Sequence, residues 1–382
     1  MKTIRRLIYG EVLAAIALVA LGFLALFFFF DLVDELQYLG KSNGLPTASD
    51  IYQIRHALFY VGLLIPNHLY ELLPISVLIG TIFVMARLAQ SSEYTILRTS
   101  GLDPWRALKM LLNLGAIFVV LSFVIGDYLA PLSERTAQLL KTRYQGTITV
   151  GQTGAWLKEK QAFTTVIANV RALSPDNEML GLQIFEFNNK GLVVSKMQAA
   201  SATFGLDDSW QLHNVSRTEF NLLADPATAS NPARQSADVT RNSIDNFRWP
   251  TEITQEMVSV ALLKPERMAT LDLFNYIRHL DANGQTAQRY EIEFWKKVFY
   301  PLSCLVMVML ALPFAYLHFR SGGIAAYVFA GVMIGISFFL LNNVFGYVGN
   351  LQNWQPWLAA AAPGILYMAI SLGAFCWLVL RR

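Results

Sequence analysis

The sequence predicts a membrane α-helical protein with six transmembrane helices, arranged three and three around an inserted β-domain. Of its 382 residues, 54% are hydrophobic and only 15% are charged, and the mean hydropathy is +0.39. The apolar residues form six nearly charge-free segments, each of about 20 residues, which is the length that crosses a bilayer as a helix. Between the third and fourth segments, short alternating runs separated by turn residues indicate strands instead.

The six segments cover approximately residues 10–32, 65–86, 109–130, 297–317, 324–347 and 357–380. The first has no charge from Val12 to Phe30 and no cleavage motif after it, which favours a membrane helix over a signal peptide. Residues 57–65 are also apolar, but a stretch this short cannot cross a bilayer alone. They either extend the second helix or form an interfacial helix.

Lysine and arginine gather on one side of these segments, and the positive-inside rule assigns that side to the cytoplasm. The opposite short loops contain only Lys41 and Arg55. We therefore expect both termini in the cytoplasm and the β-domain on the far side of the membrane. The cytoplasmic set is Lys2, Arg5, Arg6, Arg87, Arg98, Arg106, Lys109, Arg320, Arg381 and Arg382.

The predicted domains follow from these spans. Residues 1–132 hold three spans and a short cytoplasmic helix at about 90–101, residues 133–268 form the β-domain, and residues 269–382 hold connecting helices and three further spans. Alternating runs at 147–150, 163–170 and 182–187 predict the strands of a β-sandwich or jellyroll. The pattern returns to helix at Thr270 and stops at residues 281–284 (DANG), before a second helix enters the fourth span.

The cytoplasmic loop at residues 87–106 has the sequence signals of a short helix lying flat under the membrane domain. Ser91 or Ser92 can cap its start, and Gly101 can end it in a left-handed conformation. Asp103-Pro104 then begins the next helix. A helix this short is marginal alone in water, so it must dock on something. The residues expected to couple it to a soluble partner are Glu93, Tyr94, Leu97 and Arg98.

Basic residues near the outer boundary are candidates for binding a phosphorylated lipid, because charge-assisted hydrogen bonds to phosphate are strong. Solvation, or contact with bilayer headgroups, is the alternative for each of them. The candidates are Lys41, Arg55, Arg135, Lys141 and Lys296. Glu71, Asp127, Asn342 and Asn343 lie at membrane depth, and interfacial solvation and a functional role both stay open for them.

Gly331 and Gly335 form a small-xxx-small pair in the fifth span, which favours close helix packing. A gate that opens sideways to lipid could use the same smooth face.

Enzyme chemistry is not supported by any motif. The Gly40-Lys41-Ser42 run has Glu35 where a phosphate-binding loop needs its first glycine. The five histidines are scattered, and no catalytic or zinc-binding pattern occurs. The two cysteines lie in apolar segments, which favours neither a disulfide nor a metal site. We expect no enzyme, metal or cofactor in this chain and, with a net charge of only +3, no nucleic acid partner.

Four segments together resemble the LptF/LptG-type permease family of the lipopolysaccharide-transport ABC exporter, and its LptG branch most. They are residues 88–93 (LAQSSE) with Ser100-Gly101, residues 126–131 (GDYLAP), residues 154–158 (GAWLK) and residues 290–303 (YEIEFWKKVFYPLS). Their order and spacing match along nearly the whole chain.

The resemblance implies a permease subunit in the inner membrane of a Gram-negative bacterium, paired with a second LptF-type permease on a dimeric cytoplasmic ATPase. That ATPase would bind the ATP and magnesium. Lipopolysaccharide would enter sideways from the outer leaflet and pass through a periplasmic β-jellyroll to a bridge of similar jellyrolls. Glu93 matches the loop glutamate that docks into the ATPase in the family.

Asp31 stands near where the resemblance implies a lysine that meets lipid phosphates, and Lys41 or a divalent cation would have to replace it. Downstream, Lys141 keeps the charge that the family implies, whereas Gln138 does not.

One rival hypothesis is a membrane-anchored scaffold whose β-domain binds periplasmic partners without any ATPase. A second rival is an ABC protein that transmits force without a transport cavity, against which six spans argue.

Overall fold

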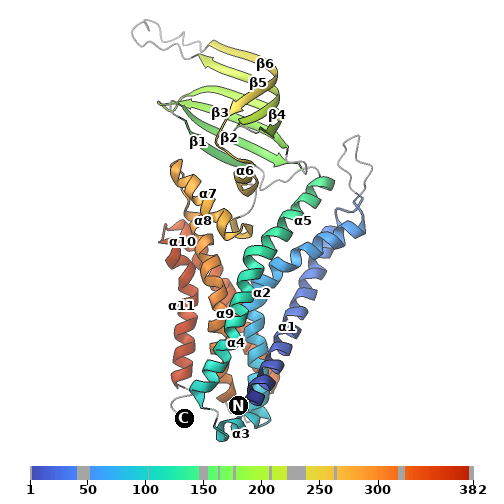
Figure 1. Cartoon of the computed structure of the whole chain (residues 1–382), viewed down its shortest axis with the longest axis vertical. Helices are drawn as coiled ribbons and strands as arrows, with labels where there is room; N and C mark the ends of the chain where they lie inside the picture. Colours follow the sequence, from blue (N-terminus) through green and yellow to red (C-terminus); the bar gives the residue numbers. More distant parts are fainter. Residues whose placement is uncertain are drawn as a thin grey trace.

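The computed structural model confirms the predicted fold class, because a bundle of long apolar helices carries an inserted β-domain at one end (Figure 1). It describes residues 2–40, 52–101, 103–145, 154–161, 164–174, 178–205, 209–221, 238–261, 265–316 and 323–377. Within these ranges, six helical segments are long and apolar enough to cross a membrane. They are Arg5–Leu36, Ile54–Gln90, Pro104–Gln138, Gln288–Tyr316, Ile324–Leu351 and Pro356–Phe375.

The first two spans are α1 (Lys2–Leu36) and α2 (Ile54–Gln90), which pack along each other. Residues 57–65 are part of α2, so they extend the second span rather than forming a separate interfacial helix. The two helices are in tight contact at Gly80, where an added Cβ would lie 2.7 Å from the backbone Cα of Ile16. A glycine is required there because any side chain would push the helices apart.

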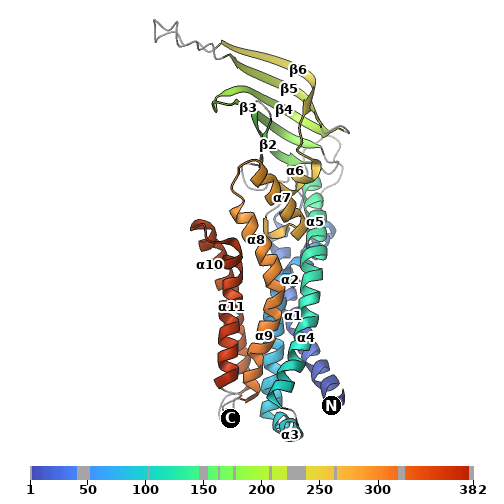
Figure 2. The same cartoon turned by 60° about the vertical axis from the view of Figure 1, so that its left-hand side comes forward.

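The third span is one continuous helical run with a change of pitch inside it. It begins as α4 (Pro104–Val124), passes through a π-helical turn, η1 (Ile125–Leu129), and continues as α5 (Ala130–Gln145). The helix therefore runs past residue 133, where the β-domain was predicted to begin, and the first described strand starts at Ala155. α5 extends past the outer end of α1 toward the β-domain (Figures 1 and 2).

The β-domain contains a six-stranded antiparallel sheet in the order β1-β2-β3-β4-β5-β6. Every strand pairs with its neighbour along the chain, so the described part is an up-and-down meander. A jellyroll needs strands that cross between two sheets, and this stays a prediction. The strands are β1 (Ala155–Lys160), β2 (Thr164–Leu173), β3 (Met179–Asn188), β4 (Val193–Phe204), β5 (Ser209–Asn221) and β6 (Asp238–Pro250).

A row of unpaired positions crosses this sheet. The pairing between neighbouring strands is interrupted at one position on each of β2 to β6. These positions are Arg171, Gly181, Ala200, Asn214 and Asp245. Two of its members have a left-handed backbone, with φ of 64° at Gly181 and 53° at Asn214. One extra residue on each strand shifts the alternation, so residues three apart face the same core. The buried pairs around the row are Val170 and Leu173, Met179 and Leu182, Ala199 and Ala202, and Leu212 and Val215.

We expect Gly181→Ala to destabilise the β-domain by about 1–2 kcal/mol, because an L-residue is strained in the left-handed region. The new Cβ would also lie 3.2 Å from Cβ of Arg171. Asn214→Gly is the matched control in the same row and is expected to change stability by less than about 0.5 kcal/mol. Thermal unfolding of the purified chain in detergent measures both. Equal midpoints for the two variants would contradict the role of the row.

Helices α6 (Gln255–Ala261) and α7 (Thr270–Ala282) lie below the sheet, at the end of the β-domain that faces the helix bundle (Figure 1), and the short η3 (Pro265–Arg267) comes between them in the chain. Val258 of α6 and Leu273 and Tyr276 of α7 are buried in the same core as the strands. Gly284, with φ of 62°, follows the end of α7, as the DANG stop predicted.

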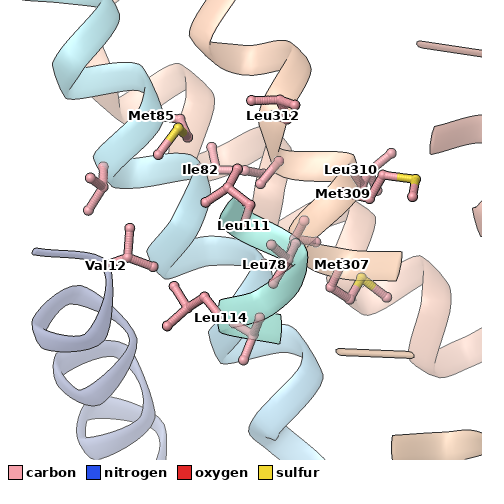
Figure 3. Packing of buried hydrophobic residues seen from close by; sticks show 14 of the residues in the cluster. Val12, Leu78, Ile82, Met85, Leu111, Leu114, Met307, Met309, Leu310 and Leu312 are labelled. Carbon is pink, nitrogen blue, oxygen red and sulfur yellow. The ribbon is translucent and has the colours of Figure 1, made fainter. Parts of the chain in front are cut away.

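The chain returns to the membrane domain through α8 (Gln288–Phe299), η4 (Tyr300–Leu302), α9 (Ser303–Ala311) and η5 (Leu312–Tyr316). It ends with α10 (Ile324–Leu351) and α11 (Pro356–Phe375). Every residue of α9 except Leu305 is buried, so this helix forms the centre of the bundle. Figure 3 shows the core around it, built from Val12, Leu78, Ile82, Met85, Leu111, Leu114, Met307, Met309, Leu310 and Leu312.

Candidate functional site

The predicted short helix exists as α3 (Glu93–Thr99), at the end of the bundle opposite the β-domain (Figures 1 and 2). Gly101 closes it with φ of 96°, and Asp103 and Pro104 begin α4, both as predicted. Ser92 is the N-cap residue, but its φ is 61° and its side chain makes no capping hydrogen bond. The predicted cap is therefore right in position and wrong in chemistry, since the turn is formed by the backbone.

Tyr94 anchors α3 to the membrane domain. Its side chain is buried, and its hydroxyl donates a 2.9 Å hydrogen bond to the Tyr316 hydroxyl at the end of η5. Leu97 packs against the same core, and the Arg98 guanidinium lies 6.0 Å from the Tyr316 ring. Burial, together with the bond to Tyr316, raises the pKa of Tyr94, so the phenol stays protonated. Tyr94 and Leu97 thus anchor α3 to the membrane domain, and their side chains face the core rather than a partner protein.

The opposite face of α3 is open. Glu93 is exposed and has no ion-pair partner among the residues that the structure describes, and Ile96 is 62% exposed beside it. Trp105, at the start of α4, is also mostly exposed. A carboxylate next to exposed apolar groups, on a helix fixed from behind, is suited to contact another protein.

The four basic candidates that the structure describes do not lie in one place. Lys41 lies outside the described residues, and the other four occupy three separate places. Arg55 and Lys141 lie near the outer ends of α1, α2 and α5, Arg135 pairs with Asp272 of α7, and Lys296 pairs with Glu293 within α8 at 2.7 Å. No single cavity of the described structure holds all of them.

Lys141 belongs to a compact cluster around Glu35, a carboxylate that is buried at the outer end of α1. Lys141 Nζ lies 3.3 Å from Glu35 Oε2, and the Tyr52 hydroxyl donates to Glu35 Oε1 at 3.0 Å. Nζ also lies 4.8 Å and 4.7 Å from the ring centres of Tyr38 and Tyr60. Burial by itself lowers the pKa of Lys141, but Tyr60 and Glu35 outweigh it, so the pKa is raised and the ammonium persists.

Arg55 is exposed at the start of α2, and its Nε lies 3.2 Å from Nε2 of His56. His56 in turn stacks on Tyr144 of α5, with ring centres 4.5 Å apart. This places Arg55 beside the Lys141 cluster, since Tyr144 also packs against Tyr52. Among the basic candidates that the structure describes, Arg55 and Lys141 are therefore the two that the fold brings together.

Asp31 does not meet a basic cluster. It forms a 2.7 Å contact with Nε2 of His68 on α2, near the outer end of α1. At the other end of the same pair of helices, Glu11 pairs with Arg87 at 2.6 Å. Asp31 thus has a structural contact along the α1–α2 seam, and nothing in this geometry gives it a lipid phosphate to bind.

A joint that sequence reasoning missed lies where the π-helical turn meets α7 and α8. Lys297 Nζ is buried and donates to the Gly126 carbonyl at 3.1 Å, and the Thr270 amide donates to Asp127 Oδ1 at 2.7 Å. Gly126 is required because an added Cβ would lie 2.3 Å from the Tyr70 ring. Asp127 was noted as polar at membrane depth, but no sequence signal pairs it with residue 270. π-helical turns often occur at functional positions.

The third span and the helices that follow the β-domain are joined again nearer to the β-domain. Arg267 of η3 pairs with Glu134 of α5, and Arg135 pairs with Asp272 of α7. Glu134 is almost fully buried, so its charge needs this partner. The helix entering the β-domain and the helices leaving it are thus held together at two levels, at residues 126–127 and at residues 134–135 of the third span.

Gly331 and Gly335 face α2 inside this chain. An added Cβ at Gly331 would lie 3.0 Å from Cδ1 of Ile82, and one at Gly335 would lie 2.9 Å from Cγ2 of Ile75. Both glycines serve close packing between α10 and α2. Their part in a lateral gate stays a prediction. Within the described residues, no group of histidine, cysteine or acidic side chains could hold a metal ion.

Comparison with known proteins agrees with this architecture. The family model for the lipopolysaccharide export system permease LptF/LptG matches residues 6–381. The lipopolysaccharide export system permease protein LptG of Escherichia coli K12 is 27% identical over 353 residues, covering 92% of this chain and 90% of that protein. The LptG protein of Haemophilus influenzae is 24% identical over 384 residues, covering 100% and 99%. Since the family match spans almost every residue of the six helices and the β-domain, the chain belongs to the LptF/LptG family of lipopolysaccharide export system permeases.

Proposed function

We propose that this chain is a permease subunit of an ABC exporter that extracts lipopolysaccharide from the outer leaflet of the inner membrane. Membership of the LptF/LptG family supports lipopolysaccharide as the transported lipid. In this proposal α3 and both termini face the cytoplasm, and the β-domain lies in the periplasm, as the distribution of lysine and arginine predicts. The β-domain, as a jellyroll, receives the lipid and passes it to a periplasmic bridge toward the outer membrane.

The observation that carries the coupling to ATP is α3, in which Tyr94 is buried against the membrane domain and the neighbouring Glu93 is exposed. A separate cytoplasmic ATPase dimer binds the ATP and magnesium, and an arginine or lysine in its groove pairs with Glu93. Because Tyr94 is bonded to Tyr316, a push on α3 acts directly on the end of the fourth span. The helix is short and would not hold its shape without this anchor.

The fourth span gives that push a route to the β-domain. From Tyr316 the chain runs back through α9 to Lys297, which is bonded to the π-helical turn of the third span. Farther along α8, Tyr290 and Phe294 pack against the core of the β-domain. A movement of this helical run therefore acts on the base of the sheet without any flexible linker between them.

A second permease of the LptF type is expected against α1 and α10. In each of these two helices only 17% of the most hydrophobic 18-residue stretch is buried within the chain, which is the lowest share among the six spans. Arg55 and Lys141 lie at the outer end of the α1 side, where the phosphates of the lipid would enter. Their charges favour phosphate binding once the lipid has lost part of its hydration.

The rival scaffold hypothesis assigns no role to an exposed carboxylate on an anchored cytoplasmic helix. The test is affinity purification of the full-length chain in mild detergent, followed by reconstitution with lipopolysaccharide. We expect an ABC ATPase and a second six-span protein to copurify, and lipid transfer to an acceptor to require ATP. A chain that copurifies only with periplasmic proteins would establish the scaffold role.

A further inference from the structure

A cavity of about 490 Å³ lies at the outer end of the fifth span, between α8, η3 and α10. It is lined by Arg289, Glu293 and Lys296 of α8, Glu266 of η3, and residues of α10. Its volume falls in the range of small-ligand sites. Gln288, which precedes Arg289 in α8, donates a 2.6 Å hydrogen bond to the carbonyl of Trp354, and aromatic residues of this kind mark a membrane–water interface. The cavity is separate from the Glu35–Lys141 cluster, which involves α1, α2 and α5.

The charges of the cavity balance. Lys296 pairs with Glu293 at 2.7 Å, and Arg289 pairs with Glu266 at 3.1 Å. Lys296 and Glu293 are only 15% and 14% exposed, so this pair is largely removed from water. Each cation still has further N–H donors, and each carboxylate has further lone pairs. A ligand that carries one negative and one positive group can therefore extend both pairs without leaving a buried charge unmatched.

Two amides on α10 complete the lining. Asn343 and Asn350 are two turns apart on one face of α10, and neither has a hydrogen-bond partner among the described residues. Gly346 lies between them and makes room for Lys296, since an added Cβ would lie 2.5 Å from Nζ. Polar side chains near the membrane are costly unless they are satisfied. The sequence left both interfacial solvation and a functional role open for Asn343. The structure places Asn343 in the lining of this cavity, together with charged groups that can bind a polar ligand.

We infer that this cavity binds the headgroup of a zwitterionic phospholipid of the ethanolamine type. The phosphate lies against Lys296 and Arg289, and the primary ammonium lies against Glu293 and Glu266. A primary ammonium donates three hydrogen bonds to carboxylates, whereas a quaternary ammonium donates none and prefers aromatic cages. Tyr347 is the aromatic residue at this cavity, so the lining favours ethanolamine over choline. Lys296 then serves a bilayer lipid rather than the transported one.

An anionic lipid fits the same cavity poorly. Phosphatidylglycerol brings the same phosphate but a neutral glycerol headgroup, so no ammonium meets Glu266 and Glu293 and the added negative charge is left unbalanced. The order of preference is therefore ethanolamine, then choline, then glycerol headgroups. This inference does not depend on the exporter function, since lipid binding is measured on the chain alone.

The test is lipid competition on the full-length chain in nanodiscs, with bound lipid read by native mass spectrometry. We expect phosphatidylethanolamine to be preferred over phosphatidylcholine and phosphatidylglycerol by about tenfold, as the loss of a charge-assisted hydrogen bond would produce. Glu293→Gln should shift the preference toward phosphatidylglycerol, and Lys296→Gln should weaken ethanolamine lipid binding. Lys190→Gln, on an exposed turn of the β-domain, is the control for a lost charge.

A merely structural ion pair would lower the thermal midpoint in both variants without changing the lipid preference in opposite directions. The inference is overturned if the wild type does not distinguish the three lipids or prefers phosphatidylglycerol. It is also overturned if soluble glycerophosphoethanolamine competes as well as the lipid, or if lipopolysaccharide displaces phosphatidylethanolamine one for one. Gly346→Ala, which moves the Lys296 ammonium, should reduce binding even where Lys296→Gln fails to fold.

Discussion

Replacing Glu93 by arginine is expected to release the ATPase from the purified permease while leaving the membrane domain folded. Glu93 is exposed and takes no part in the packing that holds α3, so the reversal costs little in stability. At the proposed interface it removes one charge-assisted contact and adds a repulsive one. Losing a charge pair that is desolvated in an interface typically costs 2–5 kcal/mol, or at least roughly thirtyfold in affinity. Copurification and ATP-dependent lipid transfer should both fall by that factor.

The matched control reverses a charge far from α3. Glu252 is exposed at the base of the β-domain, and Glu252→Arg should leave the copurified ATPase unchanged. Tyr94→Ala separates the two roles of the helix, because it removes the anchor to Tyr316 and leaves Glu93 in place. We expect it to weaken both docking and transfer. If Glu93→Arg retains the ATPase at wild-type levels, α3 is not the docking site.

The second large effect is expected from Gly80→Val, which should prevent α1 from packing on α2. The nearest atoms to the added Cβ are the Cα, N and Cγ1 of Ile16, all at 2.7 Å. Because two of them are backbone, trimming the Ile16 side chain cannot relieve the clash. Overpacking of a tight core costs 1–3 kcal/mol and occasionally more, and this site belongs at roughly 3 kcal/mol.

The same helix supplies the control for this prediction. An added Cβ at Gly62 meets nothing within 4 Å, so Gly62→Val introduces the same side chain into open space. We expect Gly62→Val to accumulate and unfold like the wild type, and Gly80→Val to give little monodisperse protein in detergent. Similar midpoints for both variants would mean that the close approach at Gly80 is not needed for the α1–α2 pairing.

Some interactions within α3 and the loop around it could be predicted from local sequence. Gly101 ends the helix in a left-handed conformation, and Asp103-Pro104 starts the next, because such punctuation depends on the conformational preference of single residues. The side toward which the Tyr94 side chain points could not be predicted from local sequence. Its partner, Tyr316, is 222 residues away, and only the packing of the fourth span brings it there.

The basic candidates show the same division. Their charge and their position near the ends of apolar segments are visible in the sequence, and these features make each of them a candidate for binding a lipid phosphate. The fold instead pairs Arg135 with Asp272 and Lys296 with Glu293, and among the candidates that the structure describes only Arg55 and Lys141 lie near each other. Which acid neutralises which base is a property of neighbouring helices, and charge counting along the chain does not contain it.

The sequence by itself determined the six spans, the inserted β-domain and the family of this protein. Hydropathy over about 20 residues decides whether a segment is long and apolar enough to cross a bilayer, and this requires no knowledge of distant residues. Only the tertiary structure decided the π-helical joint, where Lys297 meets the carbonyl of Gly126 across 171 residues of sequence. Such contacts arise because three packed helices must satisfy their buried polar groups together, and no single segment carries that requirement.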